Sequence, residues 1–131
     1  MEGNRDYKIL VVDDSTTNVV LLEAILDEKG YQIETALNAK EAYAIIEKDS
    51  PDLILLDLLM PKISGFDFLQ EIRKSEKTKN TPVIVVSALT DEENIDKIMK
   101  MGAIDFVKKP IDLQYLVERV ESVLHKAYDT Q

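Results

Sequence analysis

The 131-residue chain contains no cysteine and only one histidine. Without cysteine, neither a disulfide framework nor a thiolate metal site is possible. The single histidine, His125, lies near the end of the last predicted helix and has no partner for a metal site or a catalytic triad. These two absences exclude the commonest cysteine- and histidine-based chemistries.

Long apolar runs and positive charge are also scarce. No segment approaches the roughly 20 apolar residues of a membrane span, and the N-terminal MEGNRDYK has no apolar signal core. Asp and Glu total 25 against 16 Lys and Arg, which gives a formal charge of −9. Because nucleic-acid binding requires a basic face, we expect no direct nucleic-acid binding. Because no long apolar segment is present, we expect no membrane association.

The length and patterning of the chain are those of one α/β domain. A chain of 131 residues forms a single domain over 1–131, with a core of about 6–126. Apolar strand runs alternate with helical patterns, which is typical of βαβ units and a parallel sheet. The runs are continuously apolar, as expected for strands that helices cover on both faces.

The predicted elements are five strands and five helices, followed by a frayed end at 128–131. Continuous apolar runs predict strands at 8–14, 31–36, 51–57, 81–87 and 103–110. Helical periodicity predicts helices at 15–29, 39–48, 65–75, 91–101 and 112–126.

Chemically functional residues stand at the ends of four of these strands. They are Asp13, Asp14, Asp57, Ser87 and Lys109. In an open parallel sheet, ligands bind beyond the carboxyl ends of the strands, so these side chains are expected to share one pocket. Three carboxylates together call for a cation, and a lysine beside them suggests a phosphoryl group as a further ligand.

Each acidic or hydroxyl residue also has an ordinary structural explanation. Asp57 could cap the loop that follows its strand, and Ser87 could be a turn residue. One of Asp13 and Asp14 could cap the first helix, where an acid suits the helix dipole. A cap accounts for one aspartate, however, and not for two beside a third.

The two adjacent lysines before Pro110 are expected to differ in role. Neighbouring residues of a strand point to opposite sides, so Lys108 and Lys109 cannot both face the pocket. The alternative for both is a solvated surface pair, and Lys108 is expected to be solvated.

Taken together, these residues resemble the receiver domain of bacterial two-component response regulators. The resemblance covers roughly residues 6–126 and rests on the Asp13–Asp14 pair, LLDLLMPKISG around Asp57, VVSAL around Ser87, and DFVKKPI around Lys109. It implies a flavodoxin-like fold, a doubly wound five-stranded parallel sheet of order 2-1-3-4-5 flanked by five helices.

The resemblance also implies roles for the site residues. Asp57 is the phosphorylated aspartate. Mg²⁺ is held directly by Asp14 and Asp57, through water by Asp13, and by the backbone carbonyl of Leu59. Lys109 bridges the phosphoryl group and Asp57, and a cis peptide before the following proline aims this lysine inward.

Ser87 and Phe106 form the expected switch. The family resemblance implies that Ser87 donates to the phosphoryl group and that Phe106 then moves inward. Plain core packing explains Phe106 equally well, and many relatives have tyrosine here. The resemblance also implies that Leu59 and Leu89 flank the path of an attacking water, and their apolar side chains predict a long-lived phosphorylated form.

The implied partner is a histidine kinase or histidine phosphotransfer protein, and the implied location is the cytoplasm. Helix 91–101, strand 103–110 and helix 112–126 form the expected output face, which mediates docking or homodimerisation or is a solvated monomer surface. We expect a phosphoacceptor and not a turnover enzyme. The alternatives are a receiver-like scaffold that works without phosphorylation, and a Mg²⁺-dependent phosphohydrolase, which usually carries an acid where Leu59 stands.

Overall fold

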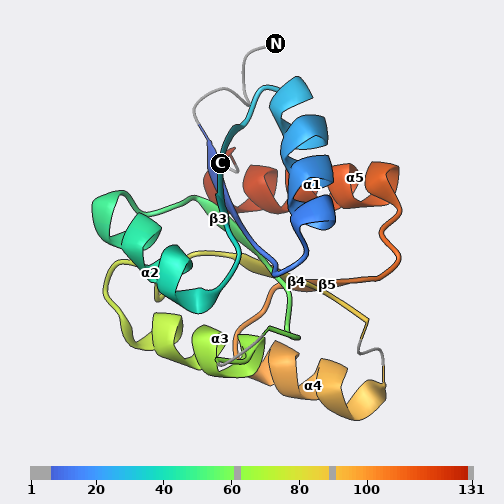
Figure 1. Cartoon of the computed structure of the whole chain (residues 1–131). Helices are drawn as coiled ribbons and strands as arrows, with labels where there is room; N and C mark the ends of the chain where they lie inside the picture. The colour runs from blue at the N-terminus through green and yellow to red at the C-terminus, as the bar shows by residue number, and fades with distance from the viewer. Residues whose placement is uncertain (1–6, 61–62, 89–90, 130–131) are drawn as a thin grey trace.

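A computed structural model describes residues 7–60, 63–88 and 91–129, in which five strands alternate with five α-helices as predicted (Figure 1). The strands are β1 (Lys8–Val12), β2 (Gln32–Ala36), β3 (Leu53–Leu56), β4 (Val83–Ser87) and β5 (Asp105–Lys108). The helices are α1 (Thr16–Glu28), α2 (Ala39–Lys48), α3 (Gly65–Lys74), α4 (Glu92–Lys100) and α5 (Leu113–Leu124), and a π-helical turn, η1 (His125–Asp129), follows α5.

The five strands form one parallel sheet in the order β2-β1-β3-β4-β5, which confirms the predicted topology. β1 has β2 on one side and β3 on the other, so the strand order reverses at β1. The connections that leave β1 and β3 therefore run to opposite faces of the sheet. The carboxyl ends of these two strands frame the crevice where this fold binds ligands.

Helices cover both faces of the sheet and enclose two apolar cores (Figure 1). α1 and α5 pack on one face, and α2, α3 and α4 pack on the other. Successive strand residues alternate between the cores, with Ile9 and Val11 in one and Leu10 and Val12 in the other. β3 and β4 are buried at every position, which explains their unbroken apolar sequences.

Each helix begins at a side-chain cap. The capping oxygen accepts a hydrogen bond from a backbone N–H of the first turn, and the five capping residues are Ser15, Asn38, Ser64, Asp91 and Asp112. α1 stops before Gly30, which has the positive φ of 98° that glycine adopts without strain. None of the helices in the described ranges is long and apolar enough to cross a membrane.

The C-terminal end differs from the prediction. The predicted helix 112–126 ends at Leu124 and gives way to the π-helical turn. Tyr128 is not frayed, because its hydroxyl donates to the carbonyl oxygen of Asp52 at 2.8 Å and its ring lies 5.5 Å from that of Tyr7. The predicted fraying was wrong for this residue since sequence periodicity cannot show a contact 76 residues away.

Replacing Tyr128 by alanine should lower the free energy of unfolding by about 1 kcal/mol, because one hydrogen bond and one aromatic contact are lost. Urea denaturation followed by circular dichroism measures the change. Tyr115→Ala is the matched control, since Tyr115 is 46% exposed and Tyr128 is 44% exposed. Equal effects of the two substitutions would show that the contacts with Tyr7 and Asp52 contribute nothing.

Candidate functional site

Backbone hydrogen bonds place three of the predicted residues at the carboxyl edge of the sheet. The N–H of Asp57 donates to the carbonyl of Val12 at 2.9 Å, and that of Lys109 donates to Ser87 at 2.9 Å. The N–H of Asp13 donates to the last carbonyl of β2 at 3.1 Å. Each residue therefore continues the sheet's hydrogen bonding just beyond its own strand, which holds its side chain over the crevice.

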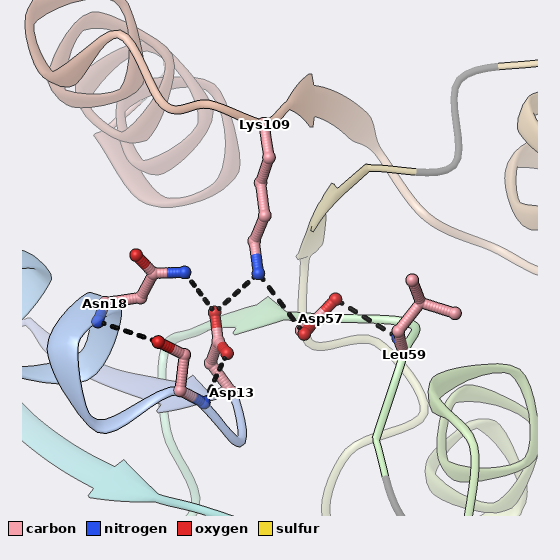
Figure 2. A network of polar contacts seen from close by, with 6 residues as sticks. Asp13, Asn18, Asp57, Leu59 and Lys109 are labelled. Carbon is pink, nitrogen blue, oxygen red and sulfur yellow. Dashed lines mark hydrogen bonds and ion pairs between the residues drawn. The ribbon is translucent and has the colours of Figure 1, made fainter.

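The Lys109 ammonium lies between two buried carboxylates (Figure 2). Its Nζ is 3.1 Å from Oδ2 of Asp13 and 3.3 Å from Oδ2 of Asp57. The Lys109–Pro110 peptide is cis, as expected. Lys108 is exposed, as expected, so the two neighbouring lysines differ in their surroundings.

Backbone donors support both carboxylates. The Ser15 N–H donates to Oδ1 of Asp13 at 2.9 Å, and the Leu59 N–H donates to Oδ1 of Asp57 at 3.1 Å. The Asn18 carboxamide approaches Oδ2 of Asp13 at 3.5 Å (Figure 2). Hydrogen bonds of this kind offset part of the cost of burying a charge.

The three predicted aspartates form one acidic cluster. Asp13, Asp14 and Asp57 each offer an oxygen, and these oxygens lie within 4.8 Å of one another. Asp13 and Asp57 are 2% and 3% exposed, whereas Asp14 is open to solvent. Three carboxylates face one ammonium group, so the cluster keeps an excess of negative charge.

This donor set fits Mg²⁺. Oxygens bound to one octahedral Mg²⁺ at about 2.0–2.1 Å stand about 3–4 Å apart, close to the spacing in the cluster. Mg²⁺ also retains several waters, and the exposed Asp14 leaves the cluster accessible to water. Asp13, Asp14 and Asp57 are therefore the side chains that would hold the ion.

Burial and charge act in opposite directions on the two central groups. Burial is the main cause that raises the pKa of Asp57, and the neighbouring Asp13 charge adds to it, while the Leu59 N–H and Lys109 oppose it. For Lys109, burial acts to lower the pKa, but Asp13 and Asp57 together outweigh it and the pKa is raised. The lysine is therefore held in its charged form.

The start of α3 packs tightly against the loop that follows Asp57. The Gly65 N–H donates to the carbonyl of Leu58 at 2.8 Å, and a Cβ on Gly65 would lie 2.5 Å from the Asp57 carbonyl oxygen. Glycine is therefore required here by close approach.

The remaining predicted residues surround the cluster. Ser87 is fully buried at the last position of β4. Phe106 on β5 is half-buried against the core formed with α2, α3 and α4. The Leu59 side chain is 51% exposed beside Asp57, and Leu89 lies outside the described residues.

Two features of the site were not predicted. Lys109 contacts Asp13 as closely as Asp57, and Asn18 reaches the same Asp13 oxygen. Helical side chains lean toward the N-terminus of their helix, and Asp13 lies at the N-terminus of α1. An asparagine in the first helical turn after an acidic strand end was therefore the signal that could have predicted the contact of Asn18 with Asp13.

Comparison with known proteins identifies the family. The model of the response regulator receiver domain matches residues 9–121. The chain therefore belongs to the response regulator receiver domain family, as the fold and the strand-end residues indicated. Receiver domains generally use Mg²⁺ at their acidic pocket, and the aspartate cluster provides such a pocket here.

Individual relatives cover the chain to similar extents. Protein PilH of Pseudomonas aeruginosa is 34% identical over 119 residues, which are 89% of this chain and 97% of PilH. Response regulator PleD of Caulobacter vibrioides is 40% identical over 88% of this chain, but the chain spans only 26% of PleD. The solved structure of Vibrio cholerae chemotaxis protein CheY4 is 31% identical, with a TM-score of 0.85 over 89% of this chain and 98% of that one.

Replacing Asp57 by asparagine should stabilise the fold at pH 7 by on the order of 1 kcal/mol. A raised pKa means that the folded state binds the proton more tightly than the unfolded chain. The protonated form of Asp57 therefore adds to the free energy of unfolding. This contribution is complete below the unfolded pKa and is lost as the pH rises through the folded pKa. Lys109 keeps Asp13 as a partner in the variant.

Urea denaturation in EDTA between pH 4 and pH 7 measures this effect. The stability difference between Asp57→Asn and the wild-type protein should grow as the pH rises. Asp14→Asn is the control, because it removes the same charge from an exposed position and should change stability less. A less stable Asp57→Asn protein at pH 7 would contradict the prediction.

Proposed function

We propose that this chain is a phosphoacceptor that takes a phosphoryl group from a phosphohistidine of a partner kinase or phosphotransfer protein onto Asp57. The observation that carries this proposal is the position of Asp57, buried beside the Lys109 ammonium and within the three-aspartate cluster. Membership of the receiver domain family supports it. A signalling role of this kind places the chain in the cytoplasm with its partner.

In the proposed step, an Asp57 carboxylate oxygen attacks phosphorus, the P–N bond to the partner imidazole breaks, and the imidazole leaves with a proton taken from solvent. The Leu59 N–H orients the carboxylate, and Lys109 supplies a positive charge beside it. Asp13, Asp14 and Asp57 would hold Mg²⁺, which would supply positive charge beside the transferring oxygens. Positioning and electrostatics therefore account for most of the rate.

The proposed response is a switch of the face formed by α4, β5 and α5. Lys109 and Ser87 hold the phosphoryl oxygens, and Phe106 moves inward as Ser87 shifts. Support for a docking role comes from a surface groove of about 430 Å³ that Phe106, Lys108 and Tyr115 help to line. Docking of an effector or of a second copy would use this face.

We infer that the phosphoryl group is accepted once and not turned over. Leu59 stands where a phosphohydrolase would usually carry a second acid, and its side chain is apolar. A scaffold that works without phosphorylation is the main alternative. The scaffold alternative does not explain why an ammonium group and three carboxylates converge. Each buried charge carries a desolvation cost, which a scaffold has no need to bear.

Incubation with Mg²⁺ and acetyl phosphate should add one phosphoryl group to the wild-type chain, as measured by intact mass. Asp57→Asn should gain none, because the nucleophile is missing. Asp52→Asn is a matched control, since it removes an aspartate from the opposite end of β3 and should leave phosphorylation unchanged. The gain should disappear in EDTA.

Two results would contradict the proposal. Phosphorylation of Asp57→Asn would place the acceptor elsewhere. Failure of the wild-type chain to gain mass from acetyl phosphate and also from a phosphorylated histidine phosphotransfer domain would favour the scaffold.

The phosphorylated form should persist for minutes or longer after acetyl phosphate is removed. The Leu59 side chain beside Asp57 is apolar and offers no group to orient an attacking water. Leu59→Asn should shorten the half-life, because a carboxamide can hold water while the backbone N–H to Asp57 is retained. A half-life of seconds in the wild-type chain, measured by intact mass over time, would refute the prediction.

A further inference from the structure

One oxygen of Asp13 has two side-chain donors on different elements. Oδ2 lies 3.1 Å from Lys109 Nζ and 3.5 Å from Asn18 Nδ2 (Figure 2). The carboxylate is 2% exposed, so neither donor is easily replaced by bulk water. The proposed phosphoryl transfer uses Lys109 but gives no task to Asn18.

Asn18 reaches Asp13 because of its place in α1. It lies in the first turn, and its backbone N–H donates to the Ser15 hydroxyl oxygen at 3.3 Å, which caps the helix. Its side chain leans back toward the helix N-terminus, where Asp13 lies. The cap uses the backbone and the contact with Asp13 uses the side chain, so a substitution can remove one without the other.

Phosphorylation of Asp57 changes the demand on Lys109. A carboxylate with one negative charge becomes an acyl phosphate with more, so the ammonium is attracted toward the phosphoryl oxygens. Asp13 then loses the lysine while it remains buried, and the Ser15 N–H and Asn18 are left as its protein donors among the described contacts, so the donation from Asn18 gains weight. At 3.5 Å, Asn18 needs to move only a few tenths of an ångström to form an ordinary hydrogen bond with it.

We propose that Asn18 is a positioning residue, which holds Asp13 by its carboxamide when Lys109 leaves this carboxylate for the phosphoryl group. This inference rests on the proposed function. In the unphosphorylated chain, Lys109 is the main donor to Asp13 and Asn18 contributes little. In the phosphorylated chain, Asn18 is the remaining side-chain donor among the contacts described around Asp13.

Two donors to one atom must show non-additive energetics. We expect Asn18→Ala to raise the unfolding equilibrium constant about twofold in the wild-type chain and about tenfold in Lys109→Met. Lys109→Met imitates the departure of the ammonium and keeps an apolar stem of similar length. Urea denaturation in EDTA measures all four proteins of this cycle, without Mg²⁺ or phosphorylation.

Asn94→Ala is the matched control for the cycle. Asn94 also donates its carboxamide to an aspartate, Asp91, at 2.9 Å, but at the start of α4, where no lysine among the described residues pairs with this aspartate. Its effect should be the same with and without Lys109→Met. Additive effects of Asn18→Ala and Lys109→Met would overturn the proposal.

A second cycle keeps the test decisive if Lys109→Met does not fold. Combining Asn18→Ala with Asp13→Asn removes the carboxylate that Asn18 is proposed to hold. The effect of Asn18→Ala should then disappear, and an unchanged effect would overturn the proposal.

The kinetic test uses acetyl phosphate at saturating Mg²⁺. Asn18→Ala should slow phosphorylation of Asp57 about three- to tenfold, the effect of one hydrogen bond, and Asn18→Gln should restore part of the rate. Thr17→Ala, an exposed substitution on the same helix turn, should leave the rate unchanged. Equal rates for Asn18→Ala and wild type would overturn the proposal.

The two experiments separate this inference from the proposed function. If the wild-type chain is not phosphorylated, the proposed function fails, but the stability cycle still decides whether Asn18 and Lys109 share Asp13. If phosphorylation occurs and the cycle is additive, the proposed function stands and the role of Asn18 fails.

Discussion

The structure of the site depends on one interaction, the placement of the Lys109 ammonium between the buried carboxylates of Asp13 and Asp57. Two carboxylates this deeply buried repel each other and lose hydration, and the lysine offsets part of both costs. A third acid, Asp14, completes the cluster from the solvent side. The balance remains negative, which makes the site receptive to a divalent cation.

The rest of the fold serves to hold these charges in place. Asp13, Asp57 and Lys109 follow three different strands, and a backbone hydrogen bond at the sheet edge fixes each of them. Two apolar cores on opposite faces make the sheet rigid, so the charged groups cannot move apart to relieve their repulsion. Stability lost at the cluster is compensated by burial elsewhere, as is common at functional sites.

The same arrangement explains how a small chemical change could alter a distant surface. Lys109 has two anionic partners, so a change of charge at Asp57 alters its contact with Asp13 as well. Its neighbour Lys108 pairs in register with Ser87, and β5 carries Phe106 toward the groove beside α5. A change of charge at Asp57 therefore acts on Lys109, which directly follows β5, and β5 leads to the outer face.

The sequence by itself determined the elements and most of the site, and its resemblance to receiver domains implied the strand order. Continuous apolar runs mark strands buried on both faces, and their end residues must meet at one edge of a parallel sheet. Strand alternation indicated that Lys108 and Lys109 face different sides, and the resemblance to receiver domains assigned Lys109 to the pocket. Only the tertiary structure decided the docking of Tyr128 beside Tyr7 and the approach of Asn18 and Lys109 to one oxygen of Asp13. These contacts depend on distances between elements, which local periodicity does not encode.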